Sequence, residues 1–110
     1  MIKGIVRRGA RTKELVKNLK PNEIAVICHE DIDELAAKAL VEAKIKAVIN
    51  TCASISGKYP HRGPSVLLES GITVLEQTGP DFFEKIKDGM EIEIKGTKVF
   101  SQNRILGQGT

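Results

Sequence analysis

The sequence predicts an α/β fold in which parallel strands are joined by crossover helices and an antiparallel hairpin follows near the C-terminus. Two observations carry this prediction. Short apolar runs of strand length alternate with helix-like segments over residues 24–88, and this order favours parallel pairing through right-handed crossovers. Residues 91–100 instead alternate apolar and polar side chains around Lys95-Gly96, which is typical of a hairpin.

Length and composition indicate one cytoplasmic domain. The chain has 110 residues, 41% of them hydrophobic, which is enough for an apolar core without metal or disulfide cross-links. It contains no run of about 20 apolar residues that would span a membrane, and its start lacks the apolar segment of a secretory signal. The two cysteines, Cys28 and Cys52, match no paired framework, so free, buried thiols are the expected state.

The first half is expected to hold three strands and two helices. Residues 2–6 fit a short edge strand, and Thr12 fits the start of a helical turn or two that ends before Pro21. Residues 24–28 and 47–49 read as buried strands. Between them Asp31 fits the N-cap of an amphipathic helix. Its apolar positions are Ile32, Leu35, Ala36, Ala39, Leu40 and Ala43.

The second half begins with a long loop that ends at Gly63. Pro64 suits the first turn of a short helix that stops at Gly71, and residues 72–75 form a third strand. Pro80 opens another short helix, which ends near Asp88 and Gly89. The hairpin of residues 91–94 and 98–100 follows, and a last strand covers residues 104–106.

The loop from Asn50 to Pro64 is the predicted functional site, because ligands of parallel sheets collect beyond the carboxyl ends of the strands. Its length exceeds the usual two to six residues of such a connection. It holds hydroxyls and two cations ahead of a helix N-terminus, which suits phosphate or carboxylate. The candidate ligand-binding residues are Asn50, Ser54, Ser56, Gly57, Lys58, Tyr59, Arg62 and Gly63, with His29, Glu30 and Asp31 as an opposite wall.

Several alternatives stay open. One alternative is that the loop has a purely structural role and covers the edge of the sheet. His61 is a low-ranked candidate for accepting a phosphoryl group or acting as an acid or base, and no other catalytic residue is assigned. A metal site from Cys28, His29, Cys52 and His61 matches no standard spacing, so neither a metal nor a cofactor is predicted.

Residues 1–20 carry seven basic side chains against one acidic, within a net charge of +3. A solvated helix face explains such a run in most proteins, and docking to nucleic acid or an anionic membrane is the alternative. Such binding would weaken steeply with salt, and nucleic acid is the less favoured partner. The basic side chains are Lys3, Arg7, Arg8, Arg11, Lys13, Lys17 and Lys20.

The motifs RTK (11–13), HED (29–31), VEAK (41–44) and ASISGKYPHRGP (53–64) resemble the N-terminal region of SteA-type bacterial proteins, over residues 4 to about 106. Those proteins belong to the cytokinetic ring and carry a thiamin-pyrophosphokinase-like portion further along. The resemblance implies the N-terminal domain of a longer, membrane-associated protein, with a cell-division protein or its own downstream domain as partner. Two positions depart from the family pattern: Cys28 replaces the usual Asp, and His61 the usual Asn.

The segment KDGMEIEIKG (87–96), together with the preceding loop and short helix, also resembles the mobile phosphohistidine domain of phosphoenolpyruvate-using enzymes. That likeness implies a swivelling β/β/α-type fold. It places His61 about one residue from the phosphorylated position of that family. The expected function is therefore a non-catalytic ligand-binding or interaction domain that takes a phosphorylated small molecule. A phosphoryl carrier is the alternative, and a homo-oligomer is a further candidate assembly.

Overall fold

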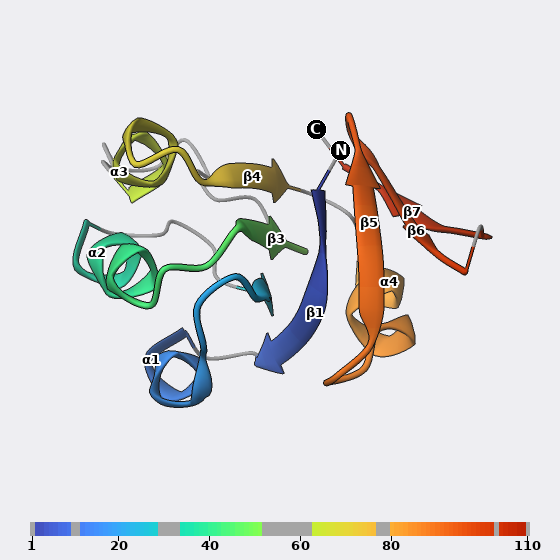
Figure 1. The fold of residues 1–110 in the computed structure, drawn as a ribbon, viewed down its shortest axis with the longest axis horizontal. Helices are drawn as coiled ribbons and strands as arrows, with labels where there is room; N and C mark the ends of the chain where they lie inside the picture. Colours follow the sequence, from blue (N-terminus) through green and yellow to red (C-terminus); the bar gives the residue numbers. More distant parts are fainter. Residues whose placement is uncertain are drawn as a thin grey trace.

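A seven-stranded mixed sheet forms the centre of the computed structural model, with the strand order β4-β3-β2-β1-β5-β6-β7 (Figure 1). The structure describes residues 2–9, 12–28, 34–51, 63–76, 80–102 and 104–109. The strands are β1 (Ile2–Gly9), β2 (Ile24–Ile27), β3 (Ala47–Asn50), β4 (Thr73–Glu76), β5 (Glu91–Lys95), β6 (Lys98–Ser101) and β7 (Arg104–Gln108). The helices are α1 (Thr12–Leu15) with the 3-10 turn η1 (Val16–Asn18), α2 (Glu34–Glu42), α3 (Gly63–Glu69) and α4 (Pro80–Lys85).

The sheet has two halves of different pairing, as predicted. Strands β1 to β4 pair in parallel, and the chain returns through helices between them. Strands β5, β6 and β7 pair antiparallel, with the tight turn after Lys95 that the sequence indicates. The fold is therefore mixed α/β, with the strands contributing more than the short helices.

The prediction of β1 as a short edge strand is wrong. It is eight residues long and lies between β2 and β5. Its first half pairs antiparallel with β5, where Ile2 lies opposite Ile94. Its second half pairs in parallel with β2, where Val6 lies opposite Ile24. One strand thus joins both halves of the sheet.

Helices α1, α2 and α3 cover one face of the parallel half (Figure 1). On that face Ile27 and Val48 pack against Leu40 of α2 and Leu67 of α3, all almost completely buried. Because the strands β2 and β3 are buried on both faces, they read as continuous apolar runs in the sequence.

The opposite face is covered by α4 and by the curled antiparallel half (Figure 1). Val26 and Ile49 point into this second core, where Phe82 of α4 is 2% exposed. Gly107 of β7 lies so close that a Cβ added there would sit 2.5 Å from the Phe82 ring. The absence of a side chain at Gly107 therefore lets β7 close over α4.

Helix α2 confirms the amphipathic prediction, with one position wrong. Leu40 is fully buried, as expected, but Leu35, expected in the same apolar stripe, is 78% exposed. Ala37, which lies outside the predicted stripe, is fully buried, so the buried face is shifted toward Ala37. The predicted helix stop at Gly71 is confirmed, with a φ of +80° that glycine adopts without strain, whereas α4 already ends at Lys85, before the predicted stop near residues 88–89.

Candidate functional site

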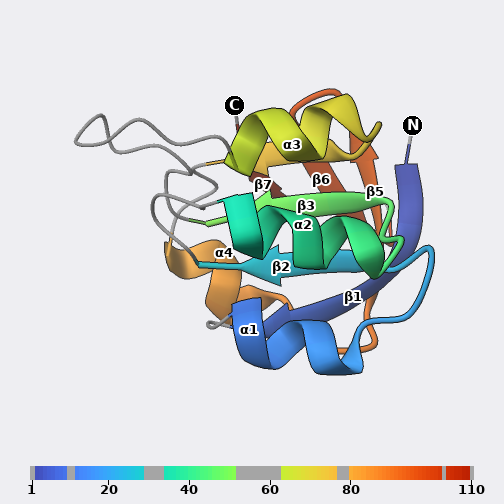
Figure 2. The same cartoon turned by 90° about the vertical axis from the view of Figure 1, so that its left-hand side faces the viewer.

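The carboxyl ends of the parallel strands lie side by side at one edge of the sheet. The register pairs Gly9 with Ile27, Ile27 with Asn50, and Asn50 with Glu76, so the four strands end at the same level. Helices α2 and α3 begin on this side of the molecule (Figure 2). We call this row of strand ends the carboxyl edge. Strands β2 and β3 are neighbours, which is the condition under which the two predicted loops would border one crevice.

Two buried polar residues end β3. Asn50 is fully buried and points to the helical face, because it is two residues beyond Val48 on the same strand. Thr51 is 6% exposed, and its backbone N–H donates to the Ile27 carbonyl at 2.9 Å. The Thr51 hydroxyl donates to the same carbonyl at 3.2 Å. These two bonds fix the start of the predicted loop against the end of β2.

Of the remaining predicted site residues, only Gly63 lies within the part of the chain that the structure describes. Gly63 begins α3, as expected, and Pro64 lies in its first turn. The helix is only seven residues long, so its dipole alone does not define an anion site. The other candidates lie outside the described residues: His29, Glu30, Asp31, Ser54, Ser56, Gly57, Lys58, Tyr59, His61 and Arg62.

Cys28 corrects the expectation of free, buried thiols. It directly follows β2, its side chain is exposed, and it is disulfide-bonded. The sequence contains one other cysteine, Cys52, which lies outside the described residues. The expectation rested on the usual redox state of the cytoplasm and on treating a strand-end cysteine as apolar.

Two arginines of the basic N-terminal segment make contacts within the domain. The Arg7 side chain donates through Nε to Glu23 at 2.7 Å, and Glu23 is 7% exposed. Arg8 donates through Nη1 to the Ile86 carbonyl at 3.2 Å, and its backbone N–H donates to the Asp88 carboxylate. Both arginines therefore make contacts within the domain, while Arg8 stays exposed to solvent.

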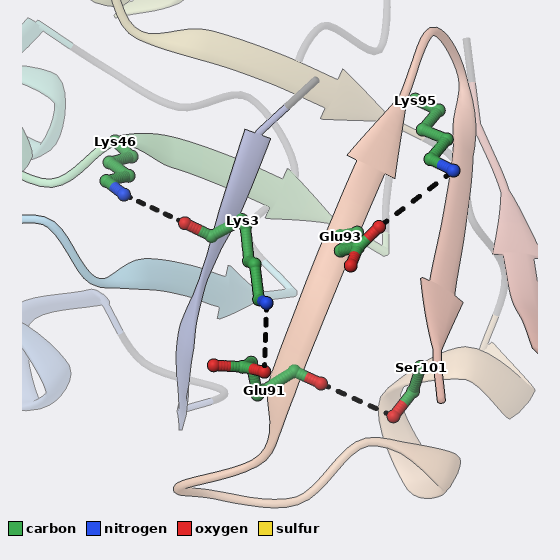
Figure 3. A network of polar contacts seen from close by, with 6 residues as sticks. All are labelled: Lys3, Lys46, Glu91, Glu93, Lys95 and Ser101. Carbon is green, nitrogen blue, oxygen red and sulfur yellow. Dashed lines mark hydrogen bonds and ion pairs between the residues drawn. The ribbon is translucent and has the colours of Figure 1, made fainter. Parts of the chain in front are cut away.

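Lys3 takes part in a surface network at the far end of β1 (Figure 3). Its ammonium lies 3.6 Å from Glu91, and its carbonyl accepts a bond of 2.8 Å from Lys46. Glu93 and Lys95 form a further contact at 4.0 Å on β5. The charges here are of mixed sign, so this end of the strand presents no continuous basic surface.

A hollow that the sequence did not predict lies at the end of β1. It has a volume of about 560 Å³ and borders the carboxyl edge through Gly9. Its lining comes from β1, from α1 with η1, and from the turn after α4, and no sequence pattern links these distant segments. The lining residues are Arg7, Arg8, Gly9, Glu14, Leu15, Asn18 and Asp88.

Within the described ranges, no three His, Cys, Asp or Glu side chains come together as metal ligands would. In the same part of the chain, no helix has the length and apolar character needed to cross a membrane. No protein-family model matches this sequence, and a search of curated proteins finds no match.

Proposed function

We propose that this domain binds a small phosphorylated molecule at the carboxyl edge and does not transform it. The observation that carries the proposal is the shared level of the β2 and β3 ends, where Ile27 lies opposite Asn50. In open sheets with parallel strands, ligands bind beyond such ends, where segments from neighbouring strands meet. Two segments with several polar side chains, residues 29–31 and 50–64, follow these two strands in the sequence.

The side chains of these segments favour the binding of an anion. Lys58 and Arg62 supply positive charge in the sequence between Thr51 and α3, and Ser54 and Ser56 supply hydroxyl donors. At the described end of β3, the Thr51 hydroxyl and backbone N–H hold the start of this segment against β2. Amides and hydroxyls bind and orient oxygen atoms but do not act as acids or bases near neutral pH. Binding without catalysis is therefore the function these groups support best.

A wider role follows from the sequence resemblance and belongs to the same proposal. The SteA-type motifs suggest that the domain works beside a downstream domain in cell division. The likeness to a swivelling β/β/α-type domain suggests that it moves relative to such a partner. The four parallel strands and the antiparallel β5, β6 and β7 are compatible with both.

The test is thermal unfolding with a panel of inorganic phosphate, nucleotides and thiamin phosphates. A ligand present at 100 times its Kd stabilises the folded state by about 2.7 kcal/mol. A domain of this size then melts on the order of 10 °C higher. We expect at least one panel member to raise the Tm of the wild-type protein, and we expect Arg62→Ala to abolish that shift.

Arg104→Ala is the matched control, because Arg104 is an exposed arginine on β7, at the opposite end of the strand order. It removes the same charge and should keep the ligand-induced shift. Absence of any shift across the panel, or an equal shift in Arg62→Ala and the wild type, contradicts the proposed anion site.

A further inference from the structure

The ends of β2 and β3 are joined by backbone contacts at the point where the two cysteines of the chain follow. Ile27 accepts both hydrogen bonds from Thr51, at 2.9 Å and 3.2 Å. In the sequence Cys28 directly follows Ile27, and Cys52 directly follows Thr51. Each cysteine is therefore adjacent to one member of a residue pair that is already in contact.

The state of Cys28 adds a second, independent observation. Cys28 is disulfide-bonded, and its side chain is exposed to solvent. Continuing the register that places Ile27 opposite Asn50 sets Cys28 opposite Thr51, the residue before Cys52 in the sequence, at the strand spacing of about 4.8 Å. A disulfide usually spans about 4.4–6.8 Å between its Cα atoms, so a link from Cys28 to the residue after Thr51 is within reach. With only two cysteines in the chain, Cys52 is the one intramolecular partner available.

We propose that Cys28 and Cys52 form a reversible disulfide that controls the carboxyl edge by redox state. This inference rests on the proposed binding function, since the controlled segment is the one that begins at Asn50. The link would tie the start of that segment to β2 by a covalent bond in addition to the two Thr51 bonds. Such a fixed segment loses less conformational freedom when it binds a ligand, so the oxidised form binds more tightly.

The exchange needs a low-molecular-weight disulfide such as glutathione disulfide as the oxidant. One cysteine thiolate attacks that disulfide, forms a mixed disulfide and releases one glutathione thiolate. The second cysteine thiolate then attacks the protein sulfur of the mixed disulfide and releases the other. Two protein thiols are oxidised and one glutathione disulfide is reduced to two thiols, and dithiothreitol reverses the reaction. The exposure of Cys28 gives both reagents access.

The test compares the whole chain after equilibration with glutathione disulfide and after reduction with dithiothreitol. Mass spectrometry with alkylation counts the thiols, and a mass lower by about 2 Da marks the oxidised chain. Thermal unfolding should show a drop on the order of 10 °C upon reduction, because the link restricts the unfolded chain. Calorimetric titration with inorganic phosphate should give at least a threefold weaker affinity for the reduced form. Cys28→Ser and Cys52→Ser should behave as the reduced wild type in both buffers.

Several results would overturn the proposal. Two alkylated thiols after treatment with glutathione disulfide, or cross-linked dimers as the only oxidised product, contradict the intramolecular link. Equal phosphate affinity of the oxidised and reduced wild type contradicts the control of binding. If phosphate binds neither form, the proposed function fails, while the thiol count and the Tm difference still decide whether the disulfide forms.

Discussion

Replacing Gly107 with valine should destabilise the domain by about 3 kcal/mol, at the upper end of the usual cost of overpacking. The added Cβ would meet the Phe82 ring at 2.5 Å, and that ring is 2% exposed and held between α4 and the curled sheet. Valine is itself favourable in strands, so a loss of stability isolates the steric conflict. Chemical denaturation of Gly107→Val beside the wild type measures this loss.

Two further variants show whether the conflict with Phe82 is the cause. Ile105→Val on the same strand should change stability little, because Ile105 is 59% exposed. Phe82→Leu combined with Gly107→Val should lose less than the sum of the single losses, because the smaller side chain leaves room for the valine. An additive double variant, or a Gly107→Val protein as stable as the wild type, contradicts the close contact of β7 with α4.

Glu23→Gln should cost about 2 kcal/mol of unfolding free energy, since hydrogen bonds to charged groups contribute about 1.5–3 kcal/mol. One carboxylate oxygen of Glu23 accepts from the Arg7 guanidinium at 2.7 Å, and the other accepts from the Lys20 backbone N–H at 2.6 Å. A glutamine side chain has a single acceptor oxygen, so one of these two donors must lose its partner. Denaturant unfolding of the variant gives the value.

Glu91→Gln is the matched control for this ion pair. Lys3 and Glu91 lie 3.6 Å apart, with side chains 53% and 59% exposed (Figure 3). Exposed pairs contribute about 0–1 kcal/mol, so this substitution should be close to neutral. Equal losses for Glu23→Gln and Glu91→Gln would show that burial of Glu23 adds nothing to the contact.

The elements that the sequence predicts well are those with a strong local pattern. Residues 24–28 and 47–49 are continuous apolar runs, and they became β2 and β3, buried on both faces. The turn after Lys95 and the helix stop at Gly71 depend on local backbone preferences, so they too are visible in the sequence. Their order along the chain was enough to predict parallel neighbours, and hence the carboxyl edge.

Features that depend on distant contacts were not predictable in this way. The central place of β1 follows from its pairing with both β2 and β5, which no local pattern reveals. Leu35 is exposed although its spacing fits the apolar stripe of α2, because packing against the sheet decides which face is buried. The hollow beside Gly9 joins segments some 80 residues apart, from Arg8 to Asp88.

The most direct test of anion binding at the carboxyl edge is a titration of the isotope-labelled domain with inorganic phosphate, followed by amide NMR. We expect saturable shifts of the Cys28, Thr51 and Gly63 amides, which lie where β2 and β3 end and α3 begins. Amides at the opposite edge, such as those of Lys46 and Ile72, should stay unchanged. Shifts confined to that opposite edge, or no saturable shift at the carboxyl edge, would contradict anion binding there.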